Sequence, residues 1–324
     1  MALYSVTDKM TMLEASRRDG FSADTRMIIE TLASTNQMLY DAPAFEANAG
    51  TINRTLQRAA LPAISHRKVN QGVGNSASET KDIVDYICQM AAYSQIDKTI
   101  VDNQIDKTGF IQGELDAFVA AMGTEQATDI IYGDHSADSA WIDGFAKRRS
   151  VKANSGDELC IDMGGTGSKL TSVYIVKWGK TTAHLIYPRG SSSCGITRSE
   201  DGVVDATDEN GKKFKAVQNY FQCDYGVTVR NPKALIRLCN IDAATINGED
   251  LIKKLIEVSY ALPDGAGNIS ILCNRDLMAK VDLATLGKTN LALPIEDAWG
   301  NRITTLRDMR FRQCDALLNA ESAL

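Results

Sequence analysis

Histidine is scarce in this 324-residue sequence, and the three histidines stand in unrelated contexts. None of His66, His135 and His184 has a second histidine or a carboxylate at the helical spacing of a metal site such as H-E-x-x-H. The serine-rich stretch at 191–195, SSSCG, lacks the G-x-S-x-G frame of a nucleophile elbow. The sequence therefore predicts no catalytic residue, no metal site and no cofactor, and ordinary surface or strand histidines are the favoured interpretation.

Long apolar runs are also missing. No stretch approaches the ~20 apolar residues that a bilayer-spanning helix needs, so no membrane partner is predicted. The N-terminus has no apolar core followed by a small-residue cleavage site, which indicates that there is no secretion signal. With 44% hydrophobic and 23% charged residues, the composition is typical of a soluble globular protein long enough for about two units.

The cysteines lack the spacing of a zinc knuckle or of a disulfide framework. They are odd in number, widely scattered and without a C-x-x-C pair, which favours reduced core cysteines in a protein made in a cytoplasm. Excess positive charge is lacking too. The net charge is −6, whereas a dedicated nucleic-acid binder needs a basic surface. The triplet Lys147, Arg148 and Arg149 is therefore interpreted as a solvated face or an intersubunit contact.

The longest helical pattern covers residues 108–132 and organises the rest of the chain. Its apolar stripe is expected to contain Leu115, Phe118, Val119, Met122 and Ile130. Asp106 or Thr108 can cap its start and Gly133 can end it. Internal glycines each cost about 1 kcal/mol relative to alanine, so this helix should form a spine along which other elements pack.

Residues 51–93 change to an alternating pattern with a glycine-, serine- and asparagine-rich tip, which predicts a long β-hairpin. A two-stranded ribbon is marginally stable in water, so a long one needs another surface to cover it, and a neighbouring subunit is the expected support. The candidate intersubunit contacts are basic and apolar residues of the outgoing arm and acidic residues of the return arm: Arg54, Leu56, Arg58, Leu61, Arg67, Lys68, Glu79, Asp82 and Asp85.

The remaining elements alternate irregularly between helix and strand. Residues 22–40 predict an amphipathic helix, and two strands at 171–179 and 182–187 are expected to meet at a tight turn. Asn210-Gly211 predicts a hairpin between 203–208 and 213–218. Further on, the patterns predict a strand at 220–230, helices at 250–262 and 275–286, and strands at 269–272 and 302–314. This order indicates an α+β fold without the β-α-β alternation of a dinucleotide-binding fold.

The glycine-rich stretch MGGTGSKL at 163–170 resembles a phosphate-binding loop only in part. Ser168 separates Gly167 from Lys169, Leu170 replaces the hydroxyl residue, and a strand is expected to follow instead of a helix. A flexible glycine loop is the favoured interpretation, and nucleotide binding at 164–169 stays an alternative.

Several stretches together resemble the major capsid proteins of short-tailed and related tailed bacteriophages, which have the Hong Kong 97-type coat fold. They follow the family's order over almost the whole chain: LASTNQMLYDAPAFEAN at 32–48, the long hairpin with YSQIDKTIVD at 93–102, TSVYIVKWGKTTAHLIYPRGS at 171–191, YGVTVRNPKALIRLCNID at 225–242, ILCNRDLMAKVD at 271–282 and WGNRITTLRDMRFRQCDALLNAE at 299–321.

The resemblance implies a division of the chain. Its parts would be an N-arm and N-terminal helix (1–50), an extended loop (51–93), a peripheral domain with the spine helix (94–150), a β-rich region with a variable hairpin at 203–218 (151–234), an axial domain (235–301), and a C-terminal strand and tail (302–324). In such coats the extended loop lies over an adjacent subunit, which is the covering surface that the hairpin requires.

The implied function is that of a coat subunit that assembles into the icosahedral shell of a phage virion. Expected partners are copies of itself in pentamers and hexamers, a separate scaffolding protein, the portal, possible decoration proteins, and packaged DNA in weak contact. No covalent cross-link is predicted. Two alternatives stay open: a nucleotide-binding enzyme using the glycine loop, and a tail-tube or adaptor protein, which the long spine helix disfavours.

Overall fold

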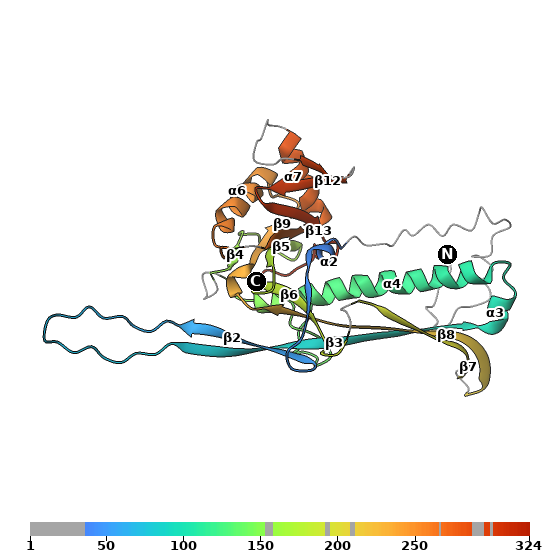
Figure 1. The fold of residues 1–324 in the computed structure, drawn as a ribbon. Helices are drawn as coiled ribbons and strands as arrows, with labels where there is room; N and C mark the ends of the chain where they lie inside the picture. The colour runs from blue at the N-terminus through green and yellow to red at the C-terminus, as the bar shows by residue number, and fades with distance from the viewer. Residues whose placement is uncertain are drawn as a thin grey trace. The chain divides into compact units, whose positions relative to one another are not determined.

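The computed structural model describes residues 36–152, 158–191, 195–207, 211–265, 267–286, 295–298 and 301–324 (Figure 1). The chain divides into two compact units. Of the described residues, one unit comprises those within 89–126 and 195–224, and the other comprises those within 36–88, 127–191 and 225–324. Most of the helix predicted at 22–40 lies outside the described residues, and its end is the short helix α2 (Met38–Asp41).

The first unit is built on parts of β3 (Glu79–Asp97), α4 (Lys107–Tyr132) and β8 (Lys213–Val229), together with α3 (Lys98–Asp102) and β7 (Thr197–Thr207). Its core consists of buried apolar side chains from β3 and α3, packed against the first turn of α4 and against β8: Ile96, Ile100, Val101, Phe110, Ile111 and Val217. Phe118 of α4 stacks on Phe221 of β8, with ring centroids 5.6 Å apart.

The spine helix begins and ends as predicted. Asp106 accepts the backbone N–H of Gly109 at 2.9 Å, which caps the first turn. At the other end, the Gly133 N–H donates to Asp129 at 2.8 Å, and a Cβ at Gly133 would meet backbone oxygens at 2.6 Å. The apolar stripe is narrower than predicted. Val119 is 43% exposed, because it lies about 100° around the helix from Phe118.

The Asn-Gly signal correctly predicted a hairpin between β7 and β8. The two strands pair antiparallel up to Thr207 and Lys213, and Asn210 lies outside the described residues. The hairpin is longer than expected, because β7 starts at Thr197. The strand predicted separately at 220–230 is the continuation of β8.

The second unit contains a mixed sheet with β5 (Leu170–Trp178) at its centre. β5 pairs antiparallel with β9 (Leu235–Asp242) on one side and with β10 (Asn268–Cys273) on the other. Parallel partners extend the sheet outwards: β4 (Cys160–Asp162) beside β9, and β13 (Met309–Gln313) beside β10. Beyond β13 come β12 (Asn301–Leu306) and β11 (Ile295–Ala298), both antiparallel.

The tight hairpin predicted between 171–179 and 182–187 is wrong. β6 (Ala183–Tyr187) shares only one parallel pair with β5, Trp178 with Ala183, and it pairs instead with β8 and with β1 (Ala44–Glu46). Every residue of β5 is buried, and both of its edges are occupied by strands that are distant in sequence, β9 and β10. The predicted strand at 302–314 is also wrong in detail. It is split into β12 and β13 by a turn at Arg307, whose φ is 57°.

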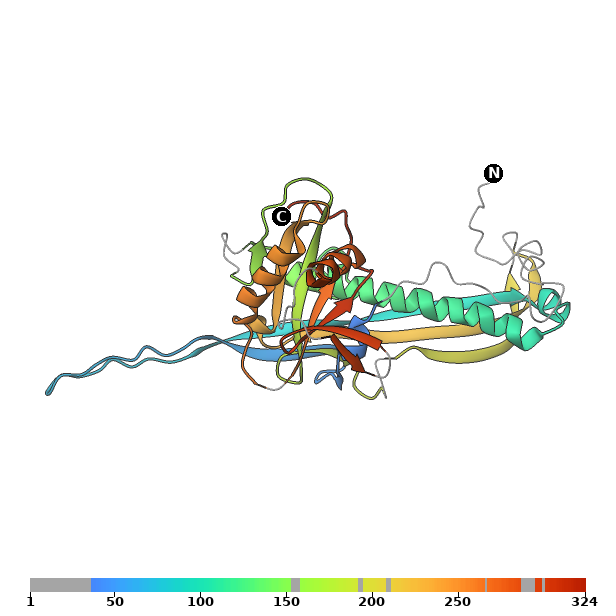
Figure 2. The same ribbon diagram turned by 90° about the horizontal axis from the view of Figure 1, so that it is seen from above.

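Helices α6 (Gly248–Ser259) and α7 (Arg275–Leu286) confirm the two helices predicted in this region. They lie side by side against the sheet in Figures 1 and 2. Their apolar faces form one core with the strands, including Leu251, Leu255, Leu277 and Val281 with Val173, Ile175, Ile236 and Ile271. Among the described residues, no helix is long and apolar enough to cross a membrane.

Candidate assembly interface

The hairpin predicted at 51–93, called here the extended hairpin, is present. β2 (Ile52–Ala60) pairs antiparallel with β3, from Ile52 opposite Tyr86 to Arg58 opposite Thr80, with a bulge before Ala60. Beyond these strands, residues 61–78 form a distal segment without strand pairing (Figure 1). Every residue of the distal segment is exposed except Pro62, which is half-buried.

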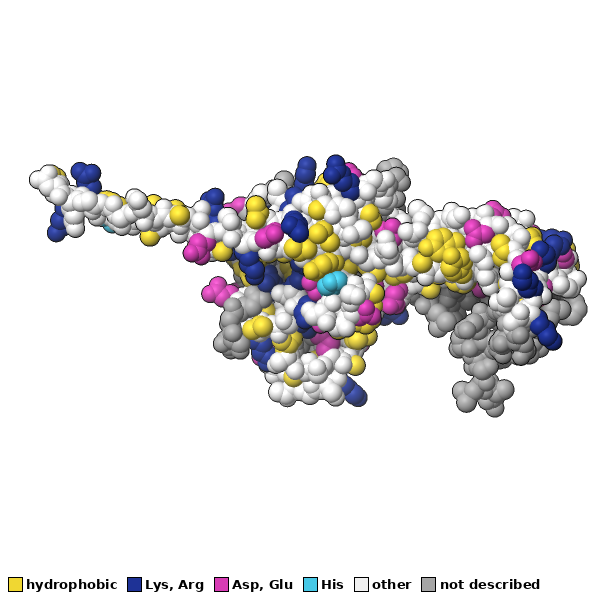
Figure 3. Space-filling view, turned by 90° about the horizontal axis from the view of Figure 1, so that it is seen from below, with side chains coloured by type: hydrophobic (Ala, Val, Ile, Leu, Met, Phe, Trp, Pro, Cys, Tyr) yellow, Lys and Arg dark blue, Asp and Glu magenta, His cyan; other side chains and the backbone are white. Residues whose placement is uncertain are grey.

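The distal segment presents apolar side chains that its own chain does not cover. Leu61, Ile64 and Val69 are 76%, 87% and 89% exposed, and Leu56 on β2 is 73% exposed. Figure 3 shows apolar and basic side chains spaced along this narrow arm at the left of the view. Isolated exposed apolar residues are common on soluble proteins, but a series of them on one unsupported arm marks an interaction site.

The charged candidates divide between the outgoing and the return arm as the sequence predicts. Arg54, Arg58, Arg67 and Lys68 of the outgoing arm are exposed, and so are Glu79 and Asp82 of the return arm. In the strand register, Asp82 lies opposite Leu56, and Glu79 lies opposite Ala60. These side chains are therefore available to solvent and to a second molecule.

Asp85 differs from the other candidates because it is buried, with 1% of its side chain exposed. It accepts a hydrogen bond from Arg148 Nη2 at 2.7 Å and another from the Thr228 hydroxyl. An isolated subunit thus already uses this carboxylate internally, so Asp85 does not belong among the exposed contact residues. The sequence held a signal for this difference, since Asp82 and Asp85 are three residues apart and point to opposite faces of a strand.

Further polar contacts, all within the second unit, fix the root of the extended hairpin to the end of β8 and the residue after it. Asn53 is buried, and its amide donates to the Thr228 hydroxyl at 3.3 Å. The Gln57 amide donates to the carbonyls of Val229 at 3.2 Å and Arg230 at 2.8 Å. The extended hairpin therefore has a root held by buried hydrogen bonds and a distal segment that is uncovered.

The basic triplet at 147–149 is mostly internal, which contradicts its interpretation as a solvated face or an intersubunit contact. Arg148 lies in α5 (Phe145–Arg148) and also donates to the carbonyls of Asp143 and Val227. Arg149 is 8% exposed and donates to Leu235 O at 2.9 Å. Guanidinium groups can satisfy several carbonyls at once, which allows their burial. Lys147 is exposed and pairs with Asp134 at 3.0 Å.

The glycine loop does not have the geometry of a phosphate site. It connects β4 to β5, so a strand follows it, as predicted. The Gly165 N–H donates to Asn240 O at 2.9 Å, and the Gly164 N–H donates to the Asp162 carboxylate at 2.9 Å. Lys152 and the Gly164 N–H lower the pKa of Asp162 to about 2. Asp162 is therefore ionised at neutral pH, and the N–H groups of Gly164 and Gly165 donate to acceptors of this chain instead of being available to a phosphate.

Two of the three histidines have structural surroundings, whereas His66 is exposed in the distal segment. The His135 ring stacks on Tyr86 with centroids 3.7 Å apart. His184 of β6 is buried, and burial together with the nearby Arg230 lowers its pKa to about 4. Within the described ranges, no cluster of histidine, cysteine, aspartate and glutamate is arranged to hold a metal ion.

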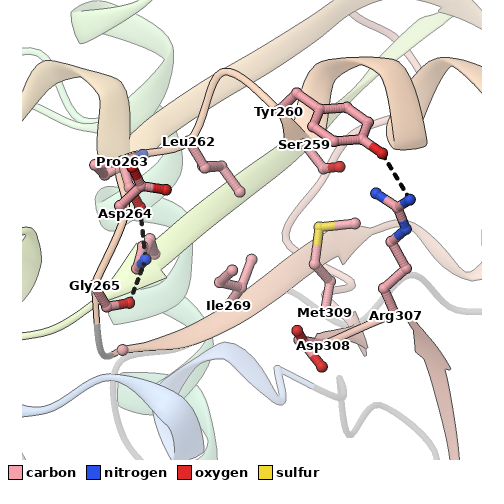
Figure 4. Close-up of a pocket in the computed structure, with 12 residues that line it drawn as sticks. Ser259, Tyr260, Leu262, Pro263, Asp264, Gly265, Ile269, Arg307, Asp308 and Met309 are labelled. Atoms are coloured by element: carbon pink, nitrogen blue, oxygen red, sulfur yellow. Dashed lines mark hydrogen bonds between the residues drawn. The ribbon is translucent and has the colours of Figure 1, made fainter.

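A cavity of about 340 Å³ lies at one edge of the second unit, lined by residues of the loop after α6 and of the β12–β13 turn (Figure 4). Lys177 reaches into it and donates to the carbonyls of Pro263 at 2.6 Å and Gly265 at 2.8 Å. Arg307 donates to the Tyr260 hydroxyl at 2.7 Å and stacks over its ring. Both basic groups thus have partners within the chain, and the lining does not pair a nucleophile with a base.

Comparison with known proteins agrees with this architecture. The family model described as Major capsid protein GP7 matches residues 21–324. No curated protein matches the chain. A chain in the near-atomic structure of bacteriophage Epsilon15 is similar, with a TM-score of 0.77 and 24% identity over 100% of this chain and 99% of that chain. The capsid of bacteriophage JBD30 gives a TM-score of 0.53 and 11% identity over 96% and 99%.

These findings confirm the predicted Hong Kong 97-type coat fold and the predicted structural role in the virion, against the alternatives of a nucleotide-binding enzyme and a tail-tube protein. The family match covers almost the entire sequence. The chain belongs to the family of GP7 major capsid proteins, the non-enzymatic coat proteins that form the icosahedral head of tailed phages.

Proposed function

We propose that the extended hairpin joins this coat protein to neighbouring copies in the shell. The observation that supports this most directly is the exposure of Leu61, Ile64 and Val69, each more than three quarters exposed in the single chain. Fully burying one such side chain contributes roughly 1.5–3 kcal/mol. Three of them on one arm supply enough apolar surface for a weak contact that closed symmetry repeats around the shell.

The exposed charges of the extended hairpin set the register of this contact. Arg54, Arg58, Arg67 and Lys68 would face acidic groups of the neighbouring copy, and Glu79 and Asp82 would face basic ones. An exposed ion pair contributes only about 0–1 kcal/mol and weakens with salt. The apolar side chains therefore supply most of the contact energy, and the charges select the partner surface.

The same proposal covers the other partners of the shell: a separate scaffolding protein, the portal, decoration proteins and packaged DNA. For DNA, the net charge of −6 supports weak contact only. Tight attachment to phosphates requires many basic contacts and counterion release. We also propose that the phage is short-tailed and that the chain divides into the extended loop, peripheral domain and axial domain described above.

The test replaces apolar residues of the distal segment by serine in the full chain, as Ile64→Ser with Val69→Ser. Shell assembly with the phage's scaffolding protein is measured by electron microscopy and sedimentation. We expect shells to be lost while the melting temperature of the unassembled subunit is unchanged, because both side chains are almost fully exposed there.

A matched control, Ser65→Ala with Asn75→Ser, changes exposed polar residues of the same segment and should assemble like the parent chain. Normal shells from the double serine variant would refute the proposed contact. Loss of shells by both variants would assign the effect to the conformation of the segment, and would refute the assigned role of the apolar side chains.

A further inference from the structure

Two buried cysteines face each other across the edge of the sheet in the second unit. Cys160 lies on β4 and Cys239 lies on β9, and both are fully buried. Their Sγ atoms are 3.8 Å apart, with the Cys160 thiol positioned to donate to the Cys239 sulfur. In the strand register Cys160 lies opposite Arg237 and Cys239 lies opposite Asp162, so the cysteines are diagonal neighbours, and an S–S bond of about 2.05 Å requires a small shift of β4 along β9 as well as side-chain rotation.

Charged groups of both signs lie near this pair, and each of the two cations has a carboxylate partner, Glu321 for Arg237 and Asp162 for Lys152. The guanidinium of Arg237 lies two residues before Cys239 on β9, and Lys152 forms an ion pair with Asp162 of β4 at 2.9 Å. The hydrogen bond from Cys160, helped by these two cations, lowers the pKa of the Cys239 thiol against the opposing effects of burial and of the Asp162 carboxylate. The thiolate is the form that reacts with oxidants.

The other close pair of cysteines has a different environment. Cys273 is the last residue of β10, and Cys314 directly follows β13, with a backbone hydrogen bond from Cys314 N–H to Cys273 O at 2.9 Å. Burial raises the pKa of Cys273 to about 12 and that of Cys314 to about 11. Their thiols should therefore stay protonated and inert, and they provide an internal comparison.

We propose that Cys160 and Cys239 form a redox modification site, at which a small peroxide closes a disulfide between β4 and β9. The Cys239 thiolate attacks one oxygen of hydrogen peroxide, giving a sulfenic acid and hydroxide. The Cys160 thiol then attacks the sulfenic sulfur, forming the S–S bond, and its proton leaves with the sulfenic hydroxyl as water, while the proton that Cys239 lost on ionisation neutralises the hydroxide. Two thiols and one peroxide thus become one disulfide and two waters.

The position of β4 gives this bond a structural consequence. β4 has three residues and pairs with β9 at the border of the sheet, so local opening can admit a small oxidant. The disulfide would tie this short strand to β9. Because a cytoplasm keeps thiols reduced and the outside of the cell does not, the bond would form in virions after release.

The test treats the full chain with hydrogen peroxide, unfolds it, blocks remaining thiols with iodoacetamide and identifies peptides by mass spectrometry. We expect a linked pair containing Cys160 and Cys239, about 2 Da lighter than the two reduced peptides and separated by dithiothreitol. The oxidised chain should melt roughly 5–10 °C higher than the reduced chain.

Cys160→Ala and Cys239→Ala should each abolish the link and the rise in melting temperature, whereas the equally buried Cys314→Ala should keep both. Cys160→Ser is a second variant, whose side chain is closer in shape to cysteine. The link itself is detected in the parent chain, so that part of the test does not depend on whether a variant folds. After peroxide treatment and unfolding, alkylation of Cys160 and Cys239 by iodoacetamide to the same extent as Cys273 would overturn the proposal. So would sulfinic acid at Cys239 without a link, or a link that leaves the melting temperature unchanged.

Discussion

Replacing Asp85 by asparagine removes the charge that holds the root of the extended hairpin. The carboxylate is 1% exposed, and its partner Arg148 is 16% exposed, so water compensates little for the lost ion pair. The asparagine has nearly the same shape, but Arg148 and Thr228 donate to different oxygens of the carboxylate, and asparagine replaces one of these oxygens with an NH2 group that cannot accept. The variant therefore tests charge rather than packing.

The magnitude follows from what Arg148 keeps. Removing one member of a buried ion pair costs about 3–5 kcal/mol, because the other charge is left without compensation. Arg148 retains hydrogen bonds to the carbonyls of Asp143 and Val227, at 2.9 Å and 3.0 Å. These contacts place the expected loss at the lower end of the range, about 3 kcal/mol in the free energy of unfolding.

Urea unfolding of the unassembled subunit measures this loss, with Asp82→Asn as the matched control. Asp82 lies on the same strand but is exposed, so its substitution should change the free energy of unfolding by less than about 0.5 kcal/mol. The Asp85→Asn midpoint should fall clearly below that of Asp82→Asn with an unchanged denaturant slope. Equal midpoints for the two variants would refute the assignment of Asp85 to an internal, stabilising pair.

Two further predictions concern the interior of the chain. The pKa of His184 is lowered from 6.5 to about 4, so the unfolded chain binds a proton at this histidine more readily than the folded chain does. The contribution of His184 to stability is therefore complete above pH 6.5 and is lost as the pH falls towards 4. His184→Gln should flatten that part of the pH profile of the melting temperature, and an unchanged slope would contradict this account. A Cβ at Gly248 would lie 2.4 Å from Lys280 O, so Gly248→Ala should force α6 from α7 and cost about 1–3 kcal/mol. A Cβ at Gly123, inside α4, would meet no atom within 4 Å, so Gly123→Ala should instead raise the free energy of unfolding by about 0.5–1 kcal/mol. Urea unfolding measures both variants. A stabilising Gly248→Ala and a destabilising Gly123→Ala would show that backbone contact does not control these sites.

Elements with local signals could be predicted from the sequence. Three such signals depend on residues within a few positions of one another: the cap at Asp106, the stop at Gly133 and the Asn-Gly turn. The cap and the stop lie where the pattern placed them, and the two strands predicted on either side of the Asn-Gly signal pair with each other. Strand partners depend on distant residues instead. The turn at Gly179 suggested a hairpin, but β5 is buried on both faces and finds its neighbours in β9 and β10.

Charged side chains were the harder part of the site to predict. Arg148 and Arg149 look like a basic surface cluster in the sequence, yet both serve buried carbonyls, and Arg148 also serves Asp85. A run of charges indicates exposure only on average, because a guanidinium with enough acceptors can be buried. Which acceptors are available is a property of the assembled second unit rather than of the triplet.

The extended hairpin separates folding from association along its length. Its root uses buried, directional hydrogen bonds at Asn53, Gln57 and Asp85, which fix orientation at the expense of tolerance to substitution. Its distal segment presents exposed apolar side chains. Hydrophobic contact is non-directional, so these side chains can bind a partner without strict geometry, and they contribute nothing to the stability of the single chain. Substitutions at the root should therefore lower the free energy of unfolding before they affect assembly, and substitutions in the distal segment should do the reverse. Measuring both quantities on both sets of variants distinguishes an anchored assembly arm from a hairpin that is merely part of the subunit surface.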